Sequence, residues 1–256
     1  MRIIAIANQK GGVGKTTTAI NLSASLAHLG RKTLLIDMDP QGNSGRGLGI
    51  DIALCKKTVY EALAKNEPLT NCIVPTEVEN LEVVPSNLRL ASLEASLYQE
   101  PIEHPFHLLA GKTQTLPGGY DYIIIDCPPS LGMLSLNALA AADSTIIPVQ
   151  CEYFAMEAVA AILSTISKVK ASYNPKLRIE GFLLTMYDPR TQLGTEISSQ
   201  VRHLFKENTF LTSIPRNQSI AESQARQMPA YLFRPTSQGA TSYLALAREV
   251  IDHEER

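Results

Sequence analysis

The feature that most constrains this chain is a glycine-rich segment near its start, NQKGGVGKTTT at residues 8–18. It lies between an apolar, strand-like run and a helical pattern, which is the setting of a phosphate-binding loop. The usual pattern G-x-x-x-x-G-K-[ST] ends at Gly14, Lys15 and Thr16, but Gln9 stands where its first glycine is expected. The segment therefore predicts a phosphate site with one departure from the common loop.

The loop residues have the chemistry that a nucleotide triphosphate requires. Glycines let backbone N–H groups turn toward an anion, and the start of the following helix adds a partial positive charge. Lys15 is placed to reach the β- and γ-phosphates, and the Thr16 hydroxyl is placed to bind Mg²⁺. The predicted nucleotide-binding residues of the loop are Lys10, Gly11, Gly12, Val13, Gly14, Lys15, Thr16 and Thr17.

Three aspartates close apolar runs that are typical of strands. Asp126 follows the apolar run YIII in YIIIDCPP, where its carboxylate can serve Mg²⁺. Asp37 and Asp39 lie two apart in LLIDMDPQGN, so their side chains point to the same face. Asp39, at the strand exit, is the candidate for positioning the attacking water. For Asp37 two interpretations stay open, a place near the metal and the loop backbone or a purely structural role.

Apolar runs alternate with helical patterns along the chain. Runs without internal alternation suit strands buried on both faces of a parallel sheet. They lie at 3–8, 33–39, 81–86, 122–129, 144–150 and 178–187. Helical patterns cover 15–28, 133–141, 155–172, 193–206 and 236–251, and Gly30 follows the first where a left-handed cap belongs. The order predicts one doubly wound α/β domain over residues 1–256, with a mostly parallel sheet, helices on both faces and ligands at the carboxyl ends of the strands.

The stretch from 40 to 120 is the least regular part of the sequence. We expect it to hold loops and small helices inserted into the domain rather than a linker. Gly45, Gly47 and Gly49 could be taken for a dinucleotide-binding fingerprint, but they do not lie directly between a strand and a helix. They are interpreted as flexible loop positions.

Composition excludes several classes of protein. A chain of 256 residues with 45% hydrophobic and 19% charged residues suffices for one large α/β domain. No apolar run approaches the roughly 18 residues that cross a bilayer, and no secretory leader is expected, so a soluble cytoplasmic protein without a membrane partner is predicted. The four cysteines lack C-x-x-C spacing, which disfavours a disulfide framework or a zinc site.

The charge is unevenly distributed. The net charge of −2 argues against a uniformly basic nucleic-acid binder. Residues 168–234, however, hold ten Lys/Arg against five Asp/Glu, which gives +5 there and −7 elsewhere. That segment is consistent with an anion-facing surface, and a set of solvated helix faces is the simpler interpretation.

Six segments follow one another along the chain: KGGVGKTT, DMDPQGN, DCPPS, VQCEYFAMEA, TMYDPRT and IPRN. In this order they resemble the ParA/Soj branch of the deviant Walker A (MinD/ParA) ATPases, which are P-loop NTPases, over essentially the whole length. The resemblance implies an ATPase that uses ATP and Mg²⁺ and is weak alone but stimulated by a partner. It implies that Asp39 assists hydrolysis and that Asp126 serves Mg²⁺ indirectly.

The resemblance also gives the second lysine of the loop a role. Lys10 would be the signature lysine that reaches across a nucleotide-sandwich dimer to the phosphates bound by the other subunit. A cation supplied in this way is present only when two ATP-loaded monomers meet, so dimerisation reports the γ-phosphate. Gly11 would be small to allow the close subunit contact. Lys10, Lys15 and Asp39 are therefore the predicted catalytic residues.

An adenine site is implied by the same family pattern. It consists of Met186 in TMYD and of Pro215, Arg216 and Asn217 in IPRN. The Asn217 amide can pair with a base edge, whereas packing in the core is the alternative role for Met186.

ParA relatives bind nucleoid DNA without sequence preference as ATP dimers and release it when a ParB-type partner stimulates hydrolysis. The resemblance thus implies a homodimer, double-stranded DNA, a ParB-type centromere-binding partner and a nucleoid-associated location. Arg190 keeps a basic position of the family. Ser219 replaces a DNA-contacting arginine and Met228 a common lysine, so weaker or relocated DNA binding is expected, with Arg226 and Arg234 as candidate replacements.

Two alternatives remain open from the sequence. A MinD-like membrane ATPase needs a basic amphipathic C-terminal helix, but the tail has two arginines and four acids from Arg248 onward. A small-molecule enzyme on the same scaffold would be an amide-forming synthetase, with a substrate pocket within residues 40–120, or an iron-protein reductase. The reductase needs a pair of cluster cysteines at the dimer interface, and Cys127 and Cys151 cannot be assigned to that pattern. The short N-terminus predicts no helix-turn-helix domain, and hence no operator binding.

Overall fold

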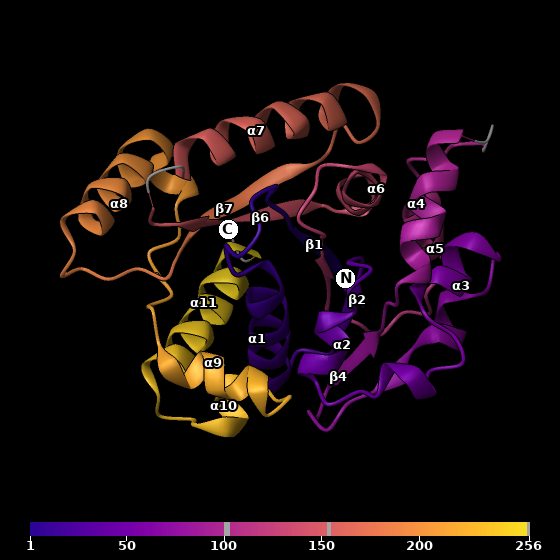
Figure 1. Ribbon diagram of the computed structural model, residues 1–256, viewed down its shortest axis with the longest axis horizontal. Helices are drawn as coiled ribbons and strands as arrows, with labels where there is room; N and C mark the ends of the chain where they lie inside the picture. The colour runs from indigo at the N-terminus through magenta and orange to yellow at the C-terminus, as the bar shows by residue number, and fades with distance from the viewer. Residues whose placement is uncertain (100–102, 153–154, 255–256) are drawn as a thin grey trace.

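The apolar runs predicted as strands are strands, and they pair into one seven-stranded sheet (Figure 1). The computed structural model describes residues 1–99, 103–152 and 155–254. The strands are β1 (Arg2–Ile6), β2 (Thr33–Asp37), β3 (Val74–Pro75), β4 (Leu81–Val84), β5 (Tyr122–Asp126), β6 (Ser144–Gln150) and β7 (Arg178–Thr185). Their order is β3-β4-β2-β5-β1-β6-β7, and every pair is parallel except β3 with β4. The predicted doubly wound, mostly parallel α/β fold is confirmed.

Helices cover both faces of this sheet. They are α1 (Lys15–His28), α2 (Asn43–Gly47), α3 (Val59–Ala64), α4 (Arg89–Gln99), α5 (Leu108–Gln114), α6 (Met133–Ala141), α7 (Ala155–Ser172), α8 (Gln192–Phe205), α9 (Gln218–Ala225), α10 (Ala230–Phe233) and α11 (Gln238–Glu254), with short 3₁₀ turns at Ile52–Leu54, Leu69–Cys72 and Lys206–Asn208. In Figure 1, α1 and α11 run side by side on one face, and α6 and α7 lie on the other.

The strands are buried on both faces, and alternate residues enter two separate cores. In β1, Ile3 and Ala5 pack toward α3 to α8, whereas Ile4 and Ile6 pack toward α1, α9, α10 and α11. A strand in the middle of such a sandwich needs apolar side chains at every position, because no side of it meets water. This is why the strand runs show no alternation in sequence.

Strand register brings acidic side chains together at one edge of the sheet. Asp37 at the end of β2 lies directly opposite Asp126 at the end of β5, and Asp126 lies opposite Ile6 at the end of β1. The loop that follows β1 therefore starts beside two aspartates that are 89 positions apart in sequence.

The first helix starts and stops as predicted. Gly14 precedes it with φ of 89°, and Gly30 follows it with φ of 81°. The Gly30 N–H donates to the Ala27 carbonyl at 2.9 Å and the Arg31 N–H donates to the Leu26 carbonyl at 3.0 Å. This pair of bonds is a Schellman cap, which requires a residue that tolerates positive φ.

The glycines after β2 were wrongly interpreted as flexible. Gly45 and Gly47 lie in α2, where they allow close packing. A Cβ atom on Gly45 would lie 2.7 Å from Ile52 Cδ1, and one on Gly47 would lie 2.4 Å from Ile20 Cδ1. Only Gly49, with φ of 80°, is a loop glycine in the expected sense.

Other predicted boundaries shift by a few residues. The helix expected at 193–206 is Gln192–Phe205, and the helix expected at 236–251 is Gln238–Glu254. The irregular stretch from 40 to 120 contains four helices and two strands within its described residues. Two residues of VQCEYFAMEA (153–154) and the last two of the tail (255–256) lie outside the part of the chain that the structure describes.

No helix in the described ranges is both long and apolar enough to cross a membrane. Cys55, Cys72, Cys127 and Cys151 are free thiols.

Two glycine substitutions test the helix cap. Gly30→Ala should lower the free energy of unfolding by about 1–2 kcal/mol, because an alanine side chain is strained at positive φ. Gly111→Ala, inside α5, should raise it by about 0.4–1 kcal/mol, because helix formation there costs glycine more backbone entropy. Neither new methyl group would meet an atom of the described residues within 4 Å, so packing does not differ between the two variants. Urea unfolding of both variants measures the two changes, and an equal effect would contradict the cap.

Candidate nucleotide-binding site

The loop between β1 and α1 has the backbone of an anion cradle. Gly12 and Gly14 both have positive φ, at 76° and 89°. Within the described part of the chain, no side chain caps the start of α1. The first N–H groups of the helix have no acceptor within the helix, so they are available to an anion at the loop.

Lys15 is turned into this loop. Its residue is only 7% exposed, and its ammonium donates to the Lys10 carbonyl at 3.0 Å. Burial lowers the pKa of Lys15, although the nearby acidic groups, led by Asp126, oppose that shift. A buried ammonium beside glycine N–H groups is positioned to bind phosphate oxygens.

Asp126 is fully buried and only partly satisfied. The Ser44 hydroxyl donates to its Oδ2 at 2.8 Å, whereas its Oδ1 has no hydrogen-bond partner among the described residues. Burial raises the pKa of Asp126 to about 6, and the hydroxyls of Thr16 and Ser44 partly offset this effect. A buried carboxylate oxygen without a donor, next to a threonine hydroxyl, fits the water ligands and hydroxyl that Mg²⁺ takes at such sites.

Asp37 is bound to the backbone of the segment that follows β2. One carboxylate oxygen accepts the Asp39 N–H and the other accepts the Ser44 N–H, both at 3.0 Å. Its burial and the nearby Asp126 charge hold its pKa well above the usual range. The structure thus gives Asp37 a role in shaping this segment, and its predicted part in the metal site stays a prediction.

Asp39 lies at the mouth of the same site. It is 8% exposed, and its Oδ1 accepts the Gln41 N–H at 2.9 Å. Its charge acts on both Lys15 and Asp126. Asp39 thus belongs to the same group of charges as Lys15 and Asp126, and its part in positioning the attacking water stays a prediction.

The ammonium of Lys10 has a different partner from that of Lys15. Its ammonium pairs with Glu152 at 3.6 Å, and the same glutamate pairs with Arg216 at 3.7 Å. Sequence reasoning did not single out Glu152, which follows the end of β6. The two loop lysines thus lie in different surroundings, Lys15 inside the loop and Lys10 at its outer side.

A cavity of about 220 Å³ adjoins the loop and contains the predicted adenine residues. Its lining consists of Gly14, Thr17, Thr185, Met186, Ile214, Pro215, Arg216, Asn217, Ile220, Ala221, Gln224 and Tyr243. Thr185 also donates to the Val13 carbonyl at 2.9 Å, and Gln224 donates to the Thr17 hydroxyl at 2.6 Å. Sequence reasoning did not assign Thr185, Gln224 or Tyr243 to this cavity: Thr185 begins the TMYDPRT segment but was given no role, and Gln224 and Tyr243 lie in no quoted segment.

Two of the predicted adenine residues have a distinctive geometry. Met186 is partly exposed, belongs to neither core and has φ of 49°, a strained conformation that is concentrated at functional sites. Asn217 caps α9 by accepting the Ser219 N–H at 3.0 Å. Only its amide NH₂ group is left to donate to a base.

The basic segment from 168 to 234 is not a single free surface. Arg190 forms a two-pronged pair with Asp188, at 2.9 and 2.7 Å, which lowers the pKa of Asp188 to about 2. Arg226 is exposed and makes no ion pair within the described residues. Ser219, expected at a DNA-contacting position, is 8% exposed in the first turn of α9. Arg226 is therefore more available than Arg190 to bind an anion such as a DNA phosphate.

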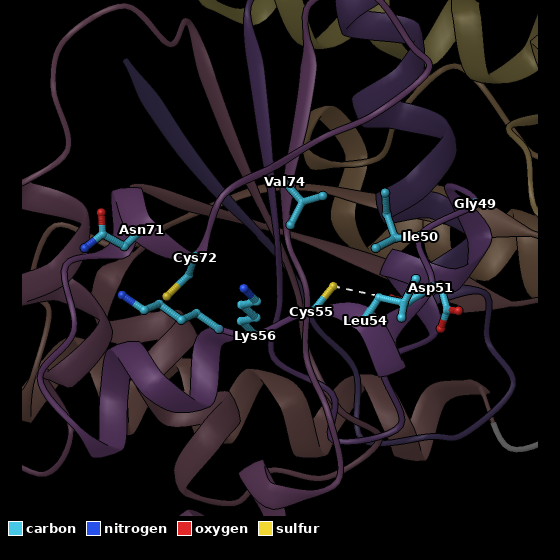
Figure 2. Close-up of a pocket in the computed structure, with 10 residues that line it drawn as sticks. Gly49, Ile50, Asp51, Leu54, Cys55, Lys56, Asn71, Cys72 and Val74 are labelled. Carbon is cyan, nitrogen blue, oxygen red and sulfur yellow. Dashed lines mark hydrogen bonds between the residues drawn. The ribbon is translucent and has the colours of Figure 1, made fainter.

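A larger open cavity, of about 680 Å³, lies between residues 49–57 and 71–74 (Figure 2). Its walls are Gly49, Ile50, Asp51, Leu54, Cys55, Lys56, Lys57, Asn71, Cys72 and Val74. None of the predicted phosphate or metal residues lines it. Burial raises the pKa of both thiols, that of Cys72 to about 11, so neither is an activated nucleophile.

Comparison with known proteins gives consistent results. A family described as an AAA domain matches residues 1–179. The chromosome partitioning protein ParA of Myxococcus xanthus is 49% identical over 98% of this chain and 88% of its own. The sporulation initiation inhibitor protein Soj of Bacillus subtilis is 47% identical over 97% and 98%. A crystal structure described as cobyrinic acid a,c-diamide synthase from Mycobacterium smegmatis, with bound ADP and magnesium, is 35% identical, with a TM-score of 0.86 over 100% and 96% of the two chains.

Two serine substitutions test the buried hydroxyl on Asp126. Ser44→Ala should lower the free energy of unfolding at pH 8 by about 1.5–3 kcal/mol, because it removes a hydrogen bond to a buried carboxylate. Ser86→Ala is the matched control, since Ser86 is equally buried but its hydroxyl has no partner in the described structure. Its stability should be unchanged or higher. Denaturant unfolding measures the free energy of unfolding of the two variants. Equal decreases in the two would contradict the role assigned to Ser44.

Proposed function

The chain belongs to the ParA/Soj family of partitioning ATPases, and from this premise we propose that residues 1–256 are one ATPase domain that switches between DNA-bound and free states. It is an ATPase, and its cofactors are ATP and Mg²⁺. The observation that best supports the switch is the divergence of the two loop lysines. Lys15 serves the phosphates of its own subunit, and Lys10 is left at the outer side of the loop for a second subunit.

The described residues suit each part of the ATP site. The N–H groups from Gly12 to Thr17 and the Lys15 ammonium would hold the phosphates, and Met186 and Asn217 would hold the adenine. Thr16 and Asp126 would hold Mg²⁺, which offsets phosphate charge during transfer. Asp39 would orient the attacking water, since it lies at the mouth of the same site.

The sandwich dimer explains why a second lysine stands in the loop. When two ATP-loaded subunits meet, Lys10 of each would reach the phosphates of the other, so the dimer forms only with the triphosphate. The dimer would bind DNA without sequence preference, on the nucleoid within the cytoplasm. A ParB-type partner would stimulate hydrolysis and thereby release it.

Two alternatives have less support. A MinD-like membrane helix would need a free apolar face, whereas Tyr243, Leu246, Ala247 and Val250 of α11 are buried in the core. A synthetase like the similar Mycobacterium smegmatis protein would need a substrate next to the γ-phosphate, but the cavity of Figure 2 shares no residue with the phosphate site. ATP turnover that rises with an acid and amine pair, and not with DNA and a partner, would favour the synthetase.

The proposal predicts ATP-dependent binding to non-specific duplex DNA. The native chain should bind only with ATP, whereas Lys15→Ala should fail to bind ATP and Lys10→Ala should bind ATP but neither dimerise nor bind DNA. Filter binding across a salt series, with light scattering for the dimer and a fluorescent nucleotide for ATP, measures all three. A native chain that dimerises with ATP but never binds DNA would contradict the partition function while keeping the switch.

A second prediction locates the DNA surface. The double variant Arg190→Glu, Arg226→Glu should weaken DNA binding and reduce the slope of log affinity against log salt by about 1.8, because each lost phosphate contact removes about 0.9. Lys168→Glu, Lys176→Glu is the matched control. It also reverses the charge of two exposed cations. Lys168 lies on α7 and Lys176 lies just before the first residue of β7, whereas Arg190 follows the last residue of β7. A larger effect of the control would move the DNA surface to that end.

A further inference from the structure

We propose that Glu152 is a restraining counter-ion for Lys10, which holds this lysine in its own subunit until pairing with a second ATP-loaded subunit draws it away. The inference rests on the proposed function, because it concerns the same lysine and the same dimer. It assigns Glu152 as a positioning residue that sets how readily the dimer forms.

The geometry places Glu152 between two functional segments. It follows β6, and its Oε2 lies 3.6 Å from the Lys10 ammonium of the phosphate loop. Its Oε1 lies 3.7 Å from Arg216, which lines the predicted adenine cavity. The Gln150 side chain donates to the same Oε1, which orients the carboxylate. One carboxylate thus connects the outer lysine of the loop to the adenine segment.

Lys10 selects this acid although a second one is near. Glu157 lines the same small surface hollow as Lys10, together with Gln9, Pro129 and Ser130. Lys10 nevertheless pairs with Glu152, and Glu157 makes no ion pair among the described residues. The pairing is therefore a specific one, and Glu157 provides a matched control at a similar position.

The backbone of Lys10 is fixed while its side chain is not. Its N–H donates to the Asn8 side chain at 3.0 Å, and Asn8 is itself held by the Pro148 carbonyl of β6 at 2.7 Å. Its carbonyl accepts from the Lys15 ammonium at 3.0 Å. Among the described residues, the ion pair with Glu152 is the only polar contact of the Lys10 ammonium, so the loss of that contact would free the ammonium while the backbone stays in place.

Release of Lys10 would cost little. The ion pair is partly exposed, with 27% of the Lys10 side chain and 46% of the Glu152 side chain open to solvent, and such pairs are weak. Glu152 would keep Arg216 as a partner after Lys10 leaves, so its carboxylate would not be left unpaired. A weak and replaceable contact suits a restraint that must open in each ATPase cycle.

The test compares dimer dissociation constants in a non-hydrolysable ATP analogue, measured by sedimentation velocity. Glu152→Gln keeps the size and the acceptor for Gln150 but removes the charge. It should tighten the dimer by about 2- to 25-fold, because an exposed ion pair changes an equilibrium by a factor of roughly 1.4 to 5 and each dimer releases two such pairs. Glu157→Gln should leave the dimer unchanged. The gain should shrink toward one at about 1 M salt, where exposed charges are screened.

A fluorescent ADP titration checks that each variant keeps its nucleotide site. If the native chain dimerises and Glu152→Gln binds ADP normally but dimerises equally or less well, the restraint is overturned. A weaker dimer would mean that Glu152 contributes to the subunit contact instead. If the native chain itself stays monomeric with the ATP analogue, the proposed dimer switch fails and this inference fails with it. The behaviour of the native chain therefore tests the proposed function, and the difference between the native chain and Glu152→Gln tests this inference.

Discussion

The site depends on two carboxylates that the sheet forces together. Register places Asp37 and Asp126 opposite each other at the ends of β2 and β5, both fully buried. Two buried carboxylates on adjacent strands repel each other, so hydrogen-bond donors nearby must stabilise each of them. Asp37 takes the N–H groups of Asp39 and Ser44, and Asp126 takes the Ser44 hydroxyl. The path of the chain after β2, and hence the position of Asp39, follows from satisfying this pair.

Asp126 also explains how the phosphate loop and the rest of the site act together. Its negative charge offsets the lowering of the Lys15 pKa by burial, and the Lys15 ammonium in turn donates to the carbonyl of Lys10. The side chain of Lys10 then falls on the outer side of the loop, beside Glu152. A loop with one lysine would need no such arrangement. The second lysine is useful only if its ammonium can leave, and the weak, partly exposed pair with Glu152 allows that.

Much of the fold was predictable because its signals are local. Strand runs such as 144–150 and helices such as 133–141 and 155–172 match the observed elements, since burial on both faces and helical spacing leave clear patterns. The stretch from 40 to 120 was less clear, because its short helices pack through single close contacts. Gly45 and Gly47 were mistaken for flexible positions because the side chains that press on them, Ile52 and Ile20, come from other elements.

By itself the sequence determined the phosphate loop, the strand-end aspartates and the family, because these depend on residues that are adjacent or in fixed order along the chain. Tertiary structure alone decided which distant groups meet. It placed Thr185, Gln224 and Tyr243 around the predicted adenine cavity, paired Arg190 with Asp188, and set Glu152 between Lys10 and Arg216. The physical reason is that ion pairs and cavity walls depend on distances of a few ångströms between segments that only the folded sheet and its crossovers bring together.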